Sequence, residues 1–95
     1  MHINGSWKKI SDADDSSKYP ETITFNKNGI YQAEASPGAK WHPVWDAGTY
    51  TLQENSISMS TSNDAVVTYA VSVTGDKLIF KDPEGCVITF VRQGN

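Results

Sequence analysis

Short β-like runs alternate with turn-forming residues along almost the whole chain. β-Branched and aromatic residues recur at every second position, and Gly, Pro, Asn, Asp and Ser separate the runs. The clearest run covers residues 65–73, in which Val67, Tyr69 and Val71 alternate with Val66, Thr68 and Ala70. A period of two is typical of a strand with one buried face, and helical periodicity is weak everywhere. The sequence therefore predicts an all-β fold.

Eight strands are predicted from this pattern. They cover residues 5–10, 21–26, 30–35, 47–53, 56–60, 65–73, 77–81 and 86–92. The residues expected to face the core are Ile23, Phe25, Tyr50, Leu52, Val67, Tyr69, Val71, Leu78, Phe80, Ile88 and Phe90. We expect at most one short helix, within residues 11–20.

The lengths of the connections indicate how the strands are arranged. Three connections are minimal, at residues 28–29, 54–55 and 75–76, and two are long, at residues 11–20 and 36–46. In an up-and-down meander successive connections alternate between the two ends, so the three tight ones share one end and both long ones share the other. We predict an eight-stranded antiparallel up-and-down meander barrel, because closure removes unpaired edges. The alternative is a two-layer β-sandwich.

Two turns carry a specific chemical signal. Asn28-Gly29 tolerates positive φ at both positions, which a type I′ hairpin requires. Asp82-Pro83-Glu84-Gly85 fits a type I turn, because proline presets φ at the second position.

Length and charge restrict the class of protein. A chain of 95 residues predicts one domain, residues 1–95. The net charge of -3 argues against a nucleic-acid partner, which would call for a basic surface. Cys86 is the only cysteine, so no intramolecular disulfide forms, and we expect it to be a small buried apolar residue.

For the cellular compartment and the oligomeric state, the sequence gives only default expectations. No apolar run approaches the roughly 18 residues of a membrane helix, and no signal peptide is visible. We expect the cytoplasm, with a trimmed export signal as the alternative, and a monomer or a weak homodimer.

Topology also places residues from the two ends of the chain together. Trp7 in the first strand and Arg92 at the end of the last strand both fall at the tightly closed end, where a guanidinium can pack over an indole. Gly5-Ser6-Trp7 together with Arg92 resembles the lipocalin signature of the calycin superfamily, in which a Gly-x-Trp motif and a late Arg close the base of an eight-stranded barrel.

Further segments resemble small bacterial lipocalin-like domains. They are residues 20–26, 28–31, 47–50 and 75–78. The resemblance implies a ligand-binding barrel in which Gly5, Trp7 and Arg92 close the base. The chain is much shorter than secreted lipocalins and lacks their disulfide and C-terminal helix. An eight-stranded barrel is only just wide enough for its own side chains or one small ligand.

The segment Trp41-His42-Pro43-Val44-Trp45-Asp46 is the strongest candidate for a site. It places two of the three tryptophans in one loop at the predicted open end, the mouth. One interpretation is a lid, in which both indoles fold over the mouth and complete the core. The other is a binding surface formed by Trp41, His42 and Trp45, backed by Tyr31 and Tyr50.

Two functional hypotheses follow. The first is a non-enzymatic binding module that takes a small apolar or amphipathic ligand at the mouth. The second is a protein-interaction or protease-inhibitor domain that presents the Trp-rich loop 36–46. We expect no enzyme, because His42 and Asp46 have no nucleophile or oxyanion motif beside them. We expect no cofactor and no metal, since the sequence offers no complete ligand set.

Overall fold

A computed structural model describes residues 3–10, 19–35 and 43–93. These residues form eight strands and no helix. The strands are β1 (Gly5–Lys9), β2 (Thr22–Phe25), β3 (Ile30–Glu34), β4 (Ala47–Leu52), β5 (Ser56–Ser60), β6 (Val66–Thr74), β7 (Lys77–Lys81) and β8 (Val87–Arg92). The short helix expected within residues 11–20 falls mostly on residues 11–18, outside the described ranges.

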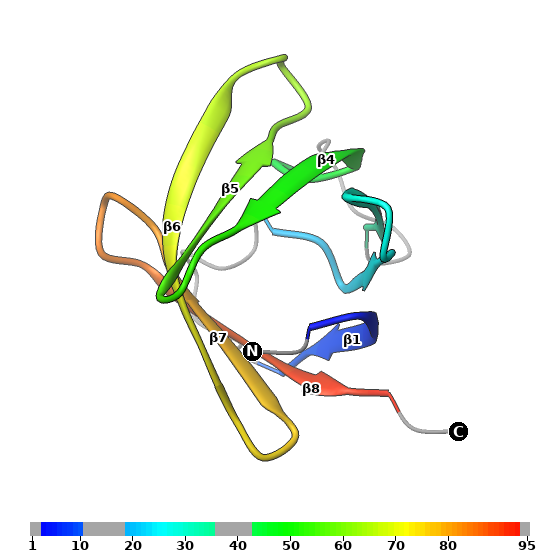
Figure 1. The fold of residues 1–95 in the computed structure, drawn as a ribbon, viewed down its shortest axis with the longest axis vertical. Helices are drawn as coiled ribbons and strands as arrows, with labels where there is room; N and C mark the ends of the chain where they lie inside the picture. The colour runs from blue at the N-terminus through cyan, green and yellow to red at the C-terminus, as the bar shows by residue number, and fades with distance from the viewer. Residues whose placement is uncertain (1–2, 11–18, 36–42, 94–95) are drawn as a thin grey trace.

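The strands form one closed barrel in chain order. Every strand pairs antiparallel with its neighbour, and β8 returns to pair with β1, with Trp7 opposite Arg92. Figure 1 shows β8 beside β1, so that the last strand completes the circuit. The predicted up-and-down meander barrel is confirmed, and the sandwich alternative is wrong.

The predicted phase of the strands is also confirmed. In β6, Tyr69 and Val71 are buried, whereas Val66 is 72% exposed. The other predicted core residues are buried or packed against the core: Ile23, Phe25, Tyr50, Leu52, Val67, Leu78, Phe80, Ile88 and Phe90. Because a slip of one residue would turn each strand inside out, the alternation fixes which side chains fill the barrel.

Aromatic rings fill the interior. The Trp45 ring lies 4.9 Å from that of Phe80, and the Phe80 ring lies 5.7 Å from that of Phe90. Towards the β2–β3 turn, Phe25 meets Tyr50 edge-on at 5.0 Å. These spacings are those of favourable ring pairs. The barrel is therefore a packed core.

The β2–β3 turn differs from the predicted type I′ geometry. Asn26 donates its backbone N–H to the Ile30 carbonyl, which leaves Lys27, Asn28 and Gly29 in the loop. Only Gly29 of these three has positive φ (83°). A three-residue loop with a final left-handed glycine is the next common hairpin solution, and it requires positive φ at one residue only. The β7–β8 turn agrees with its prediction, since Gly85 donates to the Asp82 carbonyl.

The two ends of the barrel differ in their connections. The mouth is the end that carries the β1–β2, β3–β4, β5–β6 and β7–β8 connections, and the closed end carries the other three. At the closed end Trp7 is fully buried and donates its indole N–H to the Ile3 carbonyl at 2.9 Å. Gly5 has φ of 113°, and a Cβ there would lie 3.2 Å from the Arg92 guanidinium.

Candidate functional site

Trp45 lies at the centre of the mouth. It is fully buried, and its indole N–H donates to the Tyr69 hydroxyl at 3.1 Å. Its ring lies 4.7 Å from Tyr19 and 5.2 Å from Tyr69. Tyr19 precedes β2, Trp45 precedes β4, and Tyr69 stands in β6. Three segments thus meet in one aromatic cluster at the mouth end of the barrel core.

Tyr19 is tied to the β7–β8 turn. Its hydroxyl donates to the Asp82 carboxylate at 2.7 Å. The same carboxylate accepts backbone N–H bonds from Glu84 and Cys86 at 3.0 and 2.8 Å. Asp82 is only 5% exposed. These bonds explain how a carboxylate is held in the wall of the mouth, because buried carboxylates require hydrogen-bond donors.

The tyrosines of the mouth remain protonated at neutral pH. Burial raises the pKa of Tyr19, and its hydrogen bond to Asp82 raises it further. Burial also raises the pKa of Tyr69, although the bond from Trp45 opposes this shift. Both hydroxyls therefore act as neutral hydrogen-bonding groups rather than as bases.

A pocket of about 280 Å³ opens above the cluster. Three parts of the mouth form its wall: the aromatic cluster, the aliphatic side chains beside it, and the β7–β8 turn. The described residues that line it are Tyr19, Val44, Val67, Tyr69, Asp82, Pro83 and Glu84. An apolar wall with a few polar groups is typical of a small-molecule site.

Lys9 reaches the same end of the barrel from β1. Its ammonium group donates to the Tyr19 carbonyl at 2.9 Å. Burial lowers the pKa of Lys9, and the nearby charge of Glu21 partly offsets this effect. Lys9 thereby ties the backbone of Tyr19 to the first strand.

The site residues expected from the sequence fall in different places. Tyr31 is buried, and its hydroxyl donates to the Ser60 carbonyl at the mouth end of β5. The Tyr50 hydroxyl instead donates to the Asn26 carbonyl, at the closed end, 2.5 Å away. Trp41 and His42 lie outside the described residues.

Sequence reasoning missed most of the pocket wall. Tyr19 and Asp82 are 63 residues apart, so no local pattern joins them. The available signals were a Tyr-Pro pair at the end of the first long loop and the Asp82-Pro83 turn, which topology assigns to the same end as residues 36–46.

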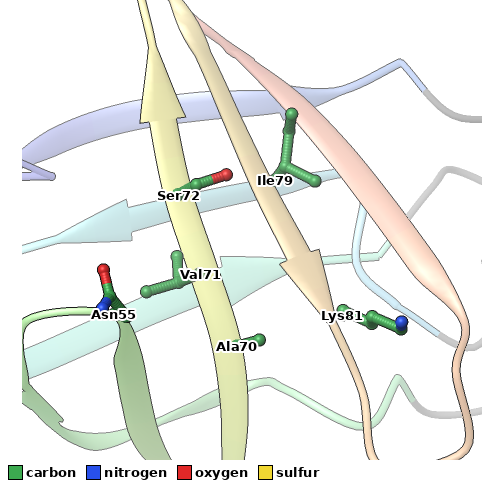
Figure 2. Close-up of a pocket in the computed structure, with 6 residues that line it drawn as sticks. All are labelled: Asn55, Ala70, Val71, Ser72, Ile79 and Lys81. Atoms are coloured by element: carbon green, nitrogen blue, oxygen red, sulfur yellow. The ribbon is translucent and has the colours of Figure 1, made fainter.

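A second hollow of about 280 Å³ lies on the outside of the barrel (Figure 2). β6 continues past the end of β5 at this point, where Val71 donates to the Asn55 carbonyl. Ser72 and Ile79 also line the hollow. It has no aromatic residue and no buried polar side chain among these lining residues, so its chemistry for recognising a ligand is poorer than that of the mouth.

Neither a metal site nor a membrane-spanning helix is found among the described residues. Within residues 3–10, 19–35 and 43–93, no group of three or more His, Cys, Asp or Glu side chains is arranged to hold a metal ion. No helix that could span a bilayer occurs in the part of the chain that the structure describes.

A filled up-and-down barrel with an aromatic pocket at one end has the architecture of a small lipocalin-like domain. A family model described as a lipocalin-like domain matches residues 3–80, and the chain belongs to this family. The family's barrel is generally a non-enzymatic binding fold. No curated protein and no solved structure matches the sequence significantly.

Proposed function

We propose that the protein binds a small apolar or amphipathic molecule in the mouth pocket. The observation that carries this proposal is the pocket of about 280 Å³ formed by Tyr19, Val67 and Tyr69 beside a buried carboxylate. Small-molecule sites typically measure roughly 300–1,000 Å³, and this pocket lies just below that range, so the ligand is small.

The filled barrel limits how deeply the ligand enters. Trp45 packs against the pocket-lining Tyr19 and Tyr69, and its ring centre lies 4.9 Å from that of Phe80 in the filled core. The ligand therefore rests on the aromatic cluster rather than inside the barrel. Trp45 and Tyr31 support the floor in this proposal, Trp41 and His42 are included on sequence grounds, and Tyr50 has no direct contact.

The alternative function is a protein-interaction or protease-inhibitor domain that presents the loop 36–46. Such a surface would gain most from exposed indoles, since Trp is a common anchor at interfaces. Trp45 is fully buried, which removes one of the two loop indoles from that role. This burial weakens the alternative and matches the lid interpretation for Trp45.

A pair of neighbouring substitutions tests the proposal. Val67 lines the pocket, whereas Val66 points outward and is 72% exposed. Val67→Trp fills the pocket, and Val66→Trp adds the same side chain outside it. With the neutral dye Nile red as the probe, we expect Val67→Trp to weaken binding about tenfold or more and Val66→Trp to leave it unchanged. Equal binding by both variants would overturn the proposal.

A further inference from the structure

The two ends of the barrel carry opposite charge. Among the described residues, the acidic side chains at the mouth are Glu21, Glu34, Asp46, Asp64, Asp82 and Glu84. The basic side chains towards the same end are Lys8, Lys9 and Lys81. At the closed end Lys27, Lys77 and Arg92 outnumber Glu54 and Asp76. The mouth is therefore negative, and the field of such an end attracts cations.

Two of these carboxylates belong to the pocket itself. Asp82 is buried in the wall, and Glu84 is exposed two residues further along the same turn. A carboxylate inside a protein wall acts through a lower effective dielectric than water, so its charge is felt more strongly by a bound ligand. Negative charge therefore lies in the pocket itself as well as over the whole mouth end of the barrel.

Aromatic side chains stand beside these carboxylates. Tyr19 and Tyr69 line the pocket and meet edge to face, with ring centres 6.5 Å apart. Faces of aromatic rings carry negative potential and attract organic cations. Aromatic rings and carboxylates around one hollow disfavour an anionic head group and favour a cationic one.

The neighbouring cation does not reverse this preference. Lys9 donates its ammonium group to the Tyr19 carbonyl and is influenced by the charge of Glu21. It is not among the described lining residues of the pocket. The Lys9 ammonium group is therefore held at the Tyr19 carbonyl, beside an acidic neighbour.

We propose that the mouth pocket selects small organic cations, namely amines with an aromatic or aliphatic body, over neutral and anionic molecules of the same shape. The apolar body lies against Val44 and Val67, and the ammonium group faces Asp82 and Glu84. This inference rests on the proposed function, because it names the ligand class of the same pocket.

Three probes of similar size test the charge preference: phenethylammonium, phenethyl alcohol and hydrocinnamate. They share a phenyl ring on a two-carbon chain and differ in charge. Binding is measured by calorimetry at neutral pH with the full chain. We expect phenethylammonium to bind about tenfold more tightly than hydrocinnamate, with the alcohol between them, and added salt to reduce the difference.

Two variants that each remove one negative charge test whether the preference for cations comes from the pocket. Glu84→Gln removes a carboxylate from the pocket rim, and Glu54→Gln removes one from the closed end. We expect Glu84→Gln to lower the affinity for phenethylammonium about threefold or more while leaving that for phenethyl alcohol unchanged. Glu54→Gln should leave both affinities unchanged.

The outcomes separate the two proposals. If the alcohol and hydrocinnamate bind as tightly as phenethylammonium, the inferred cation preference is wrong and ligand binding at the mouth stands. If both variants lower the affinity equally, the preference does not come from the pocket and the inference is also wrong. If none of the probes binds and Nile red does not bind either, the proposed function itself fails.

Discussion

The guanidinium carbon of Arg92 lies 4.2 Å from the centre of the Trp7 ring. The two residues also face each other across the pairing of β1 with β8. Arg92 donates from Nη1 to the Asn4 carbonyl at 2.8 Å, so the last strand is bound to the segment that leads into the first. The contact therefore joins the two ends of the barrel circuit at one point.

Removing the indole should destabilise the fold strongly. Trp7 is fully buried, and a Trp7→Ala substitution in such a site costs about 3–5 kcal/mol in the free energy of unfolding. Chemical denaturation followed by circular dichroism measures this loss. A variant as stable as the original protein would show that Trp7 does not support the closed end.

Two glycines with positive φ should differ in how much an added side chain destabilises the fold. A Cβ on Gly5 would approach Arg92 to 3.2 Å, whereas a Cβ on Gly75 would have no neighbour within 4 Å. We expect Gly5→Ala to cost about 1–3 kcal/mol and Gly75→Ala to cost less, since Gly75 at φ 61° lies in the left-handed region that other residues can adopt, whereas Gly5 at φ 113° lies outside it and its Cβ would also crowd the guanidinium. Thermal melts of the two variants check the order, and a larger loss for Gly75→Ala would contradict it.

The bond between Trp45 and Tyr69 should contribute to stability as well as to the pocket floor. Tyr69→Phe removes the acceptor of a buried indole N–H, which costs about 1–3 kcal/mol because the donor is left without a partner. Urea denaturation measures the change. The outward-facing Val66→Ala serves as the control, and a loss no larger than in that control would mean that the bond is unimportant.

Deprotonation of the Tyr31 hydroxyl should lower the stability of the fold at alkaline pH. Burial raises the pKa of Tyr31 to about 12, and the charge of Asp46 adds to the shift. A tyrosine in the unfolded chain has a pKa of about 10. Between pH 10 and pH 12 the folded state therefore binds more protons than the unfolded state. The stabilising contribution is complete below pH 10 and is lost as the pH rises towards 12. Denaturation from neutral to alkaline pH should show a shallower decline in stability for Tyr31→Phe, and equal slopes would refute this assignment.

The fold was predictable because local and global patterns agree. In β6 a strict alternation distinguishes Tyr69 and Val71, which are buried, from Val66, which is not. The hairpin at Asn28-Gly29 shows the limit of such reasoning. The pair Asn28-Gly29 fits either a two-residue loop with positive φ at both residues or a three-residue loop with positive φ at Gly29 alone, and the backbone bond from Asn26 to Ile30 decides between them.

The candidate site was only partly predictable. Counting connections placed Trp45 at the mouth, but burial of its indole depends on Tyr19 and Tyr69, which come from distant parts of the chain. Tyr50 faces the interior as expected, yet its hydroxyl reaches Asn26 at the closed end. Alternation gives the face of a strand that a side chain occupies, and it does not give the direction in which a long side chain leans.

Amide chemical shifts during a titration test the central claim most directly. Phenethylammonium added to the labelled protein should move the resonances of Val44, Val67, Tyr69 and Glu84, which line the mouth pocket. The resonances of Asn55, Ala70 and Ile79, beside the outer hollow, should stay in place. Shifts confined to the outer hollow would contradict ligand binding at the mouth, and no shifts at all would contradict the inferred preference for organic cations.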